Sequence, residues 1–414
     1  MSSRGILVQS LRRLKAALVR AFEESARHDG ALTLPIGRVL ALGPDQRFHH
    51  PARVALEWLD ESPGAESTPV QAASAGWSHG PKIRGREEVE PIHFPAVVRH
   101  RFRDARVCAA SSSILMADRL IVERVVGIDP SRCSYAAGHL LAHGRRTAIV
   151  AQRPEQKLDA GAFLGGNGAF NYYHWIIELL SRLEFIEDDG RPLLVSDDVA
   201  RIPTFQETLT LAAGARAVVF LKQDATYRVA DLIYVQSPSI CPFNLRRDEQ
   251  FEVRDFQLRP SSIEFLRGRL LGPSLLRHRT STRRRLFFAR KPVRRGYNQD
   301  EIFAIFERRG FEKVYMEDLS LKEQIEAVQG ADMLAGPTGA AWTNLLFVER
   351  GTRCICWMAE EQRGFAGYSN LAHAVGAELR YVTYAAGVTD SERLYFIDYR
   401  LDPGAVEREL DELA

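Results

Sequence analysis

Short apolar runs alternate with helical segments along the last third of the chain, and this alternation restricts the fold more than any other feature of the sequence. The apolar runs lie at 286–290, 313–316, 333–335, 354–357 and 379–383. Helix signals fall between them: Ser320 and Glu323 have the spacing of a capping box, and Gly330 is placed to end that helix. Strands that alternate with helices form parallel β-α-β units, so this region predicts a Rossmann-like domain.

A similar but less regular alternation precedes it, between residues 105 and 235. Its apolar runs lie at 107–110, 114–117, 147–151, 193–195, 217–221 and 232–235, and its longest helical stretch is 171–187. The chain has 414 residues, of which 45% are hydrophobic, and this is enough to enclose two cores. We therefore predict the α/β class with two Rossmann-like domains, at 96–272 and 273–390, followed by a C-terminal strand and helix at 391–414.

The region 1–95 is predicted to be an N-terminal helical extension and a connector. Between residues 6 and 26, leucines and Phe22 recur every three to four positions among Arg and Lys, which predicts an amphipathic helix. Such a helix packs on its own domain or lies on an anionic membrane surface, and both interpretations stay open. Residues 61–90 are rich in Pro, Gly, Ser and Ala without periodicity, which predicts an exposed connector with ordered structure resuming near Pro91.

Charge and cysteine content exclude several classes of protein. The 55 Lys and Arg residues and the 53 Asp and Glu residues give a formal net charge of +2, too low for a dedicated nucleic-acid binder or a polybasic membrane binder. The five cysteines include no C-x-x-C pair, which argues against a disulfide framework and a thiolate zinc site and favours a reducing cytoplasm. No apolar run approaches the ~20 residues of a membrane span, so we expect neither secretion nor a transmembrane segment.

One cluster of candidate catalytic residues lies in N-Y-Y-H-W-I-I-E-L-L-S-R-L, residues 171–183. Helical spacing places its large apolar side chains on one face, and on the other His174, Glu178, Ser181 and Arg182. A carboxylate one turn from an imidazole can fix its tautomer and raise its basicity, as a general base requires. The alternative interpretation is a solvated helix with a Glu178–Arg182 ion pair. The glycine-rich segment 165–168 favours function, since glycines let a ligand approach the backbone closely.

A second cluster, M-L-A-G-P-T-G-A-A-W-T-N at 333–344, joins an apolar run to a helix. Unpaired backbone N–H groups and the positive helix end should meet near Gly339, which predicts a phosphate site. The segment is neither a G-x-G-x-x-G fingerprint nor a Walker loop, and a plain strand-to-helix turn is the alternative. Arg290, at the carboxyl end of the first strand here, supports the phosphate site because ligands collect at that edge of an open α/β sheet. A solvated loop is expected for at least two of the residues that follow, Lys291, Arg294 and Arg295.

Four motifs together resemble glycosyltransferase family 61, which includes bacterial capsular polysaccharide biosynthesis proteins. They are N-Y-Y-H-W-I-I-E-L-L-S-R-L, L-F-F-A-R, L-S-L-K-E-Q-I-E-A-V-Q-G-A-D and G-P-T-G-A-A-W-T-N-L-L-F, in matching order and spacing between residues 165 and 357. The resemblance implies a B-type glycosyltransferase fold, in which two Rossmann-like domains face a cleft. It also implies a nucleotide-sugar donor held mainly by the C-terminal domain, an acceptor in the cleft and inversion at the anomeric carbon.

By position, the resemblance assigns His174 and Glu178 to the cleft helix of the family and Arg290 to its basic residue after the first C-terminal strand. The residues that fall on its G-P-H-G-A-x-x-T-N loop and helix are Gly336, Gly339 and Asn344. The departure is Thr338, which stands where the family usually has His. Threonine can cap the helix and donate one hydrogen bond but carries no charge, so this position bears on donor choice and on activity.

We expect a cytoplasmic, inverting hexosyl- or pentosyltransferase that moves a sugar from a UDP-linked donor to a bacterial surface or capsular glycan. His174 is expected to act as the base, oriented by Glu178. The leaving diphosphate is expected to be stabilised by Arg290, by the helix dipole and by the backbone N–H groups from Thr338 to Ala341, including that of Ala340. Glu317, after the second strand, is a candidate for binding the ribose hydroxyls.

We expect neither a metal ion nor a cofactor, because no D-x-D motif lies near the candidate donor loop. The expected partners are the nucleotide sugar, which is a substrate, and the glycan acceptor; the N-terminal helix leaves open a peripheral contact with the inner face of the membrane. Two alternative functions remain. One is a nucleotide-sugar epimerase of the same architecture, and the other is a non-catalytic glycan-binding or assembly protein, which the threonine at position 338 leaves open.

Overall fold

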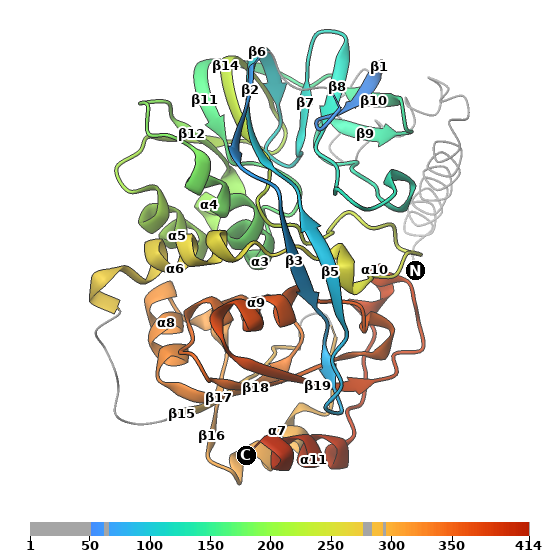
Figure 1. The fold of residues 1–414 in the computed structure, drawn as a ribbon, viewed down its shortest axis with the longest axis vertical. Helices are drawn as coiled ribbons and strands as arrows, with labels where there is room; N and C mark the ends of the chain where they lie inside the picture. Colours follow the sequence, from blue (N-terminus) through green and yellow to red (C-terminus); the bar gives the residue numbers. More distant parts are fainter. Residues whose placement is uncertain (1–50, 62–65, 276–283, 293–294, 414) are drawn as a thin grey trace, which may run out of the picture.

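The computed structural model describes residues 51–61, 66–275, 284–292 and 295–413, which form two main β-sheets with helices around and between them (Figure 1). The mixed α/β class predicted from the sequence is confirmed. The helix expected at 6–26 lies outside the described residues. Among the helices of the described segments, none combines the length and the apolar character needed to cross a bilayer.

The sheet at the lower end of Figure 1 is parallel throughout, with the strand order β16-β15-β17-β18-β19-β4. Its strands are β15 (Arg284–Phe288), β16 (Phe311–Val314), β17 (Ala331–Pro337), β18 (Arg353–Ala359), β19 (Glu378–Tyr384) and β4 (Lys82–Ile83). Each apolar run predicted in the last third of the chain contributes one strand. Ser320 and Glu323 form the predicted capping box at the start of α8 (Leu321–Gln329).

Helices cover both faces of this parallel sheet. α8 and α9 (Gly367–Val375) lie on the side toward the other sheet, whereas α7 (Gln299–Glu307) and α11 (Pro403–Leu413) lie on the outer side (Figure 1). Two covered faces explain why its strands read as nearly continuous apolar runs. The C-terminal helix is present as predicted, but a short helix, α10 (Ser391–Leu394), stands where a strand was expected. The Asp390 carboxylate accepts the N–H of Arg393 there and favours a helical turn.

The other sheet has 11 strands and mixes parallel with antiparallel pairs. One side of it is parallel, in the order β13-β12-β11-β14. These strands are β11 (Glu155–Phe163), β12 (Leu193–Ser196), β13 (Val218–Leu221) and β14 (Thr226–Val235). A helical segment at 172–185 connects β11 to β12, and α4 (Asp197–Arg201) and α5 (Pro203–Ala213) connect β12 to β13. The predicted alternation of strands and helices is therefore confirmed for this part.

The same prediction is wrong for residues 97–151. There the sheet continues through β6 (Val97–Val107), β7 (Ser113–Leu115), β8 (Arg119–Val122), β9 (Leu140–His143) and β10 (Thr147–Ala151). The pairs β14–β6, β6–β7, β7–β8 and β10–β9 are all antiparallel. The physical reason is the length of the links: a parallel crossover needs a dozen or more residues, and the turns after β7 and β9 are far shorter.

The exposed connector predicted at 61–90 is also wrong, since ordered structure begins before Pro91. β1 (Pro51–Trp58) precedes this segment, and the strands in it are β2 (Glu66–Gln71), β3 (Ser74–His79), β4 and the start of β5 (Val89–Phe94). β3 and β5 form a hairpin that runs from one main sheet to the other (Figure 1). A Cβ atom at Gly76 would lie 2.3 Å from the ring of Phe94. This glycine, which looks typical of a linker, therefore permits close packing within the hairpin.

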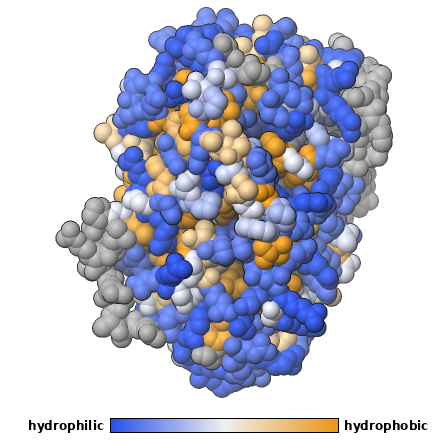
Figure 2. Space-filling view, viewed as in Figure 1, coloured by the Kyte–Doolittle hydropathy of each residue, from blue (hydrophilic) through white to orange (hydrophobic). Residues whose placement is uncertain are grey.

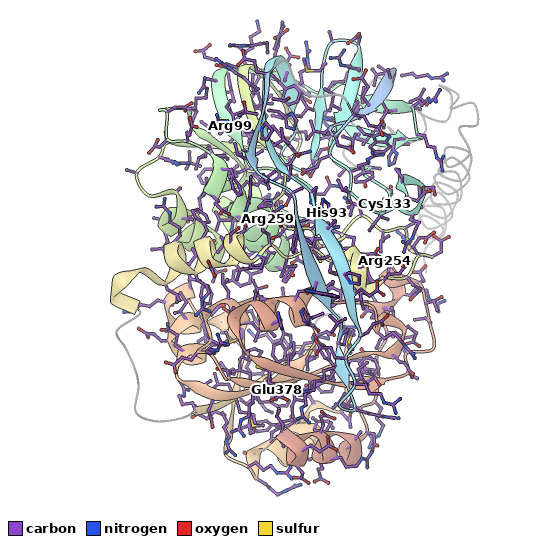
Figure 3. All side chains as sticks on the ribbon, in the orientation of Figure 1. His93, Arg99, Cys133, Arg254, Arg259 and Glu378 are labelled. Atoms are coloured by element: carbon purple, nitrogen blue, oxygen red, sulfur yellow. The ribbon has the colours of Figure 1, made fainter. Side chains whose placement is uncertain are left out.

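The two main sheets share one hydrophobic core that runs through the helices between them. Arg259, labelled near the middle of Figure 3, precedes α6 (Pro260–Leu275), donates to the carbonyl of Pro95 and lies 5.1 Å from the centre of the Phe94 ring. Hydrophilic side chains cover most of the face seen in Figure 2, and patches of hydrophobic side chains show mainly toward its middle. The helices that carry the predicted site residues therefore lie in a packed junction between the sheets.

Candidate functional site

The helical segment at 172–185 changes its winding along its length. It consists of α3 (Tyr172–His174), one π-helical turn (Trp175–Leu179) and a 3₁₀ stretch (Leu180–Phe185). The Asn171 side chain accepts the N–H of Tyr173 at 2.9 Å and caps the start. The apolar face is buried as predicted. A π-helical turn inside a helix is frequent at functional sites, and this one contains Glu178.

His174 and Glu178 are brought into direct contact. The imidazole Nδ1 is hydrogen-bonded to the Glu178 carboxylate, whose other oxygen accepts the backbone N–H of Cys241 at 2.8 Å. His174 is buried, with 7% of its surface exposed. A carboxylate that accepts the Nδ1 proton leaves the lone pair of the ring on Nε2, and no atom of the described residues is hydrogen-bonded to Nε2. The pair is therefore arranged as a general base requires.

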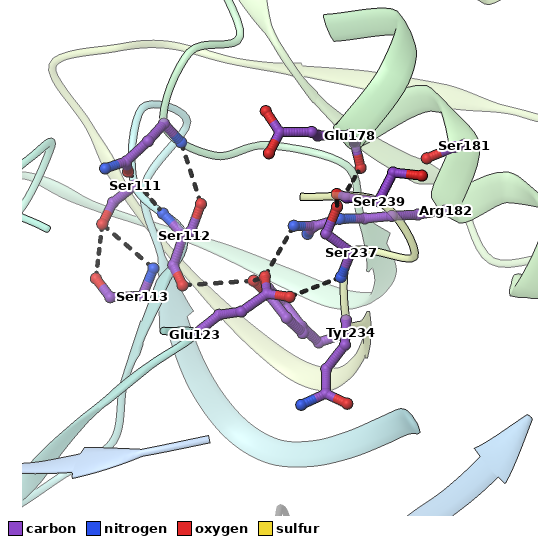
Figure 4. A network of polar contacts seen from close by, with 12 residues as sticks. Ser111, Ser112, Ser113, Glu123, Glu178, Ser181, Arg182, Tyr234, Ser237 and Ser239 are labelled. Carbon is purple, nitrogen blue, oxygen red and sulfur yellow. Dashed lines mark hydrogen bonds and ion pairs between the residues drawn. The ribbon is translucent and has the colours of Figure 1, made fainter. Parts of the chain in front are cut away.

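The solvated helix with a Glu178–Arg182 ion pair is not what the structure contains. Arg182 is 2% exposed and donates to Glu123 at 2.8 Å (Figure 4). The same Glu123 carboxylate accepts the hydroxyl of Tyr234 at 2.5 Å and the backbone N–H of Ser237 at 2.6 Å. The Ser237 hydroxyl in turn donates to the carbonyl of Glu178 at 3.0 Å. Arg182 therefore belongs to a buried network that supports the turn carrying Glu178.

Glu123 is a residue that the sequence analysis missed. It follows the apolar strand β8 and lies 59 positions from Arg182 in the chain. The sequence gives no signal for it, because helical spacing places Arg182 on the polar face, where a solvated arginine needs no buried acceptor. Nothing local identifies which of the carboxylates of the chain supplies it.

The glycine-rich segment before the helix approaches the imidazole itself. Gly168 has φ +83°, and a Cβ atom there would lie 3.0 Å from Cβ and 3.1 Å from Cγ of His174. At Gly168 the group that lies close to the backbone is the side chain of His174, and the predicted approach of a ligand stays a prediction. Asn167, next to it, donates its N–H to the hydroxyl of Ser112 at 3.1 Å and accepts the N–H of Ser112 at 3.1 Å. The loop against His174 is thus held in place by Ser112, which directly precedes β7.

The second cluster lies at the carboxyl edge of the parallel sheet. Arg290 follows β15, Glu317 follows β16 and Thr338 follows β17. The Arg290 guanidinium donates through Nη2 to the carbonyl of Thr338, and its Nη1 is buried without a partner. A Cβ atom on Gly339 would lie 3.2 Å from Nη2. The glycine therefore leaves room for the guanidinium against the loop.

Arg295 joins this cluster, although a solvated loop was expected for at least two of the residues Lys291, Arg294 and Arg295. It is 8% exposed, and its Nη2 lies 3.5 Å from the carbonyl oxygen and 3.4 Å from the hydroxyl of Thr338. Its Nη1 donates to the carbonyl of Leu394 at 2.9 Å. Lys291 instead pairs with Asp318 near the surface, and Arg294 lies outside the described residues.

The electrostatics of this cluster are unbalanced. Burial lowers the pKa of Arg290, and the neighbouring positive charge of Arg295 lowers it further. No carboxylate of the described residues forms an ion pair with either guanidinium. Two neighbouring positive charges, one half-buried and one buried, that share one carbonyl and lack an acid are a favourable site for an anion.

The backbone next to the two arginines adds further donors. Within the described segments, the N–H groups of Gly339, Ala340 and Ala341 donate to no acceptor, as is usual at the start of a helix, here η6 (Ala340–Phe347). The N–H of Thr338 is not among them, contrary to prediction, because it donates to the carbonyl of Trp357 at 2.9 Å. The predicted Thr338 cap is also wrong: Gly339 occupies the N-cap position and no side chain caps the helix.

Three other predicted residues take different places. Asn344 is fully buried and donates to Gln324 at 3.0 Å and to the carbonyl of Ala341 at 3.0 Å, so it fixes η6 against α8. A Cβ atom on Gly336 would lie 2.7 Å from Cβ of Phe288, which makes this glycine a requirement of strand packing. Glu317 is exposed at the end of β16, on the same sheet edge as Arg290.

Two tyrosines connect the His174 cluster to the Arg290 cluster. Tyr173, beside His174, donates to the carbonyl of Gly367 at 3.1 Å, and its ring lies 5.5 Å from that of Tyr368. Burial raises the pKa of Tyr368, and the nearby charge of Arg290 opposes that shift. α3 also packs against η6. Both clusters therefore belong to one region where the two sheets meet.

In the described part of the chain, no three His, Cys, Asp or Glu side chains are placed to share a metal ion.

Residues 172–355 match a protein family model described as Glycosyltransferase 61. No curated protein matches the chain. The matched segment begins in α3, ends in β18, and contains His174, Glu178, Arg290 and Thr338.

Proposed function

Residues 172–355 belong to glycosyltransferase family 61, and from this premise we propose that the chain is an inverting glycosyltransferase that uses a nucleoside diphosphate sugar. The proposed donor carries UDP, and the proposed acceptor is a bacterial surface or capsular glycan. The transferred group is a hexose or a pentose. The proposed architecture is the B type, in which the mixed sheet and the parallel sheet form two facing halves.

One observation carries this proposal: the half-buried Arg290 and the buried Arg295 lie together without a carboxylate partner, next to three unpaired backbone N–H groups. An uncompensated buried charge costs several kcal/mol, so an anion of matching charge stabilises the arrangement when it binds. A diphosphate offers phosphate oxygens to both guanidiniums and to the helix start at once. The same groups would stabilise the charge that develops on the leaving diphosphate.

The His174 cluster supplies the other half of the reaction. In a single displacement, Nε2 of His174 takes the proton of the acceptor hydroxyl while that oxygen attacks the anomeric carbon from the side opposite the diphosphate. Glu178 holds Nδ1 and stabilises the imidazolium that forms. One displacement inverts the anomeric configuration. Glu317, on the same sheet edge, is proposed to bind the ribose hydroxyls.

The test of the donor site is calorimetry of UDP binding to the Arg290→Gln and Arg295→Gln variants. A hydrogen bond to a charged group contributes ~1.5–3 kcal/mol, so each variant should bind UDP ~10- to 100-fold more weakly. The matched control is Arg285→Gln at the amino end of β15, where the side chain donates to the carbonyl of Arg309 at 2.9 Å. Near-normal UDP binding by both variants contradicts the proposed donor site.

We also propose that transfer needs no divalent cation, because the protein itself supplies positive charge at the diphosphate through Arg290, Arg295 and the helix start. Turnover should be the same in EDTA and in Mn²⁺. Loss of activity in EDTA that Mn²⁺ restores contradicts this part of the proposal.

A further inference from the structure

Two exposed aromatic side chains touch each other next to His174. Phe170 is 56% exposed and Phe243 is 43% exposed, and their ring centres lie 5.8 Å apart in an edge-to-face arrangement. The Phe243 ring also packs edge-to-face on the imidazole of His174, 4.8 Å between centres. In the described segments, no other ring contact joins two exposed Phe, Tyr or Trp residues. The pair therefore forms an apolar surface at the edge of the proposed base.

The loops that carry these two rings are fixed in place rather than free. Phe170 directly precedes the helix cap Asn171, whose N–H donates to the carbonyl of Gly168 at 2.8 Å. Phe243 lies two residues after Cys241, whose N–H holds the Glu178 carboxylate. The Asn167 amide joins the loops by donating to the Asn244 side chain at 2.9 Å. The same contacts that set His174 and Glu178 thus set the position of the aromatic pair.

Stability does not explain this arrangement. Burying a phenylalanine side chain contributes ~1.5–3 kcal/mol, and here two of them stay exposed on loops already held by polar contacts. Apolar surface kept exposed beside a polar site is typical of a ligand-binding surface. The ligand it suits has an apolar face and polar edges, as a pyranose ring has: its C–H bonds can lie on an aromatic ring while its hydroxyl groups reach outward. The amide nitrogen of Asn244 donates to no described residue and is available to one of those hydroxyls.

We infer that Phe170 and Phe243 form the acceptor subsite, where a pyranose ring of the glycan acceptor stacks and presents a hydroxyl to His174. This inference rests on the proposed function, because it takes His174 as the base. It adds the acceptor side, for which the Arg290 cluster gives no information. Its chemical class is a neutral sugar ring rather than a nucleotide.

Saturation-transfer NMR with methyl β-glycopyranosides of gluco, galacto and xylo configuration tests this inference without turnover. With UDP present, at least one sugar should receive saturation from the wild-type protein. Phe243→Ala and Phe170→Ala should reduce that signal at least fivefold, whereas Phe243→Tyr should retain it. Phe170→Ala is the cleaner variant, because Phe170 packs on Phe243 and not on His174. The matched control is Phe220→Ala in β13, at a residue that is also partly exposed.

Calorimetry of UDP binding to the same variants separates the two proposals. Normal UDP binding together with a lost sugar signal supports the acceptor subsite. Equal sugar signals in the wild type and in both alanine variants overturn it and leave the donor site standing. No sugar signal at all, with dodecylphosphocholine micelles that bind the wild type and not the variants, assigns the pair to a lipid surface and also overturns it. Failure of UDP binding in the wild type, with an intact sugar signal, overturns the proposed donor instead.

Discussion

In the His174 cluster each of the two carboxylates contacts a basic side chain, whereas in the Arg290 cluster two guanidiniums face no carboxylate among the described residues. Glu123 meets Arg182, and Glu178 meets His174. Arg290 and Arg295 instead converge on the carbonyl of one residue, Thr338. The difference indicates two kinds of preorganisation: one network is complete and fixes the geometry of a base, and the other is left incomplete so that an anion can complete it.

The largest expected effect is on enzyme turnover, and it comes from the His174 cluster, whose network of partners is complete. A positioned base contributes ~10²–10⁴ in rate, so His174→Ala should lower kcat by that factor while UDP binding stays near normal. Glu178→Gln should cost less, because the imidazole remains and the amide oxygen can still accept the Nδ1 proton. Steady-state kinetics with the donor varied, together with UDP calorimetry, measures both. If His174→Ala turns over normally, the base lies elsewhere and the helix is structural.

The next effect concerns stability. Removing one partner of a buried ion pair costs ~3–5 kcal/mol, so Glu123→Gln should lower the free energy of unfolding by about that amount, since it leaves Arg182 buried without an acid. The double variant Glu123→Gln with Arg182→Met removes both charges and should recover part of the loss. Urea unfolding of the three proteins measures this. A double variant less stable than Glu123→Gln would show that the pair does not act as a unit.

A third prediction contrasts the sheets through their histidines. Burial lowers the pKa of His100 and of His143 to about 4 and that of His139 to about 3. All three lie in the mixed sheet or in its loops, whereas residues 284–414 contain only His373, which is exposed. The unfolded chain binds these three protons near pH 6.5 and the folded chain does not, so their contribution to stability is complete above that pH and is lost as the pH falls toward 4.

Each of these histidines contributes a slope of up to ~1.4 kcal/mol per pH unit. The free energy of unfolding should therefore fall between pH 7 and pH 5. As the pH is lowered, protection against hydrogen exchange should be lost at a higher pH in β9 and β10 than in β17 and β18. His139→Gln should flatten the dependence by about one third. A stability that is constant over this range contradicts the lowered pKa values.

The same contrast separates what the sequence predicts from what it does not. The strands β15 to β19 of the parallel sheet are predicted one by one, because their signals are local: apolar runs, a capping box at Ser320 and helix-ending glycines. The sixth strand, β4, comes from the segment predicted as a connector and is missed. The antiparallel half of the mixed sheet depends on link lengths and on pairing between distant segments. Periodicity within a run carries neither kind of information.

The site shows the same limit at the level of single residues. His174 and Glu178 are predicted together because one helical turn separates them. The burial of Arg295 depends on Leu394, 99 positions away, and the partner of Arg182 comes from β8. The local sequence around Arg295 therefore predicts a solvated loop, and only the contact with a distant segment buries this side chain. Asn344 shows the converse, because its place in the motif predicts a ligand contact, whereas its amide holds η6 against α8.

The smallest expected effect is at Thr338, and it sharpens the assignment of the anion site. The carbonyl of Thr338 accepts from both guanidiniums, whereas its hydroxyl has one long contact, 3.4 Å from Arg295. Thr338→Val keeps the shape and the carbonyl and removes only the hydroxyl. A neutral hydrogen bond contributes about 1 kcal/mol, so UDP binding should weaken by no more than ~5-fold.

Thr338→Ala should behave alike, since the unpaired N–H groups of Gly339 to Ala341 do not depend on this side chain. The comparison with Arg295→Gln, measured by the same UDP titration, then ranks charge above hydroxyl at the site. If Thr338→Val weakens UDP as much as Arg295→Gln does, the hydroxyl rather than the guanidinium holds the phosphate. In that case Arg290 and Arg295 serve to position the loop, and the incomplete network is a structural one like its counterpart around Glu123.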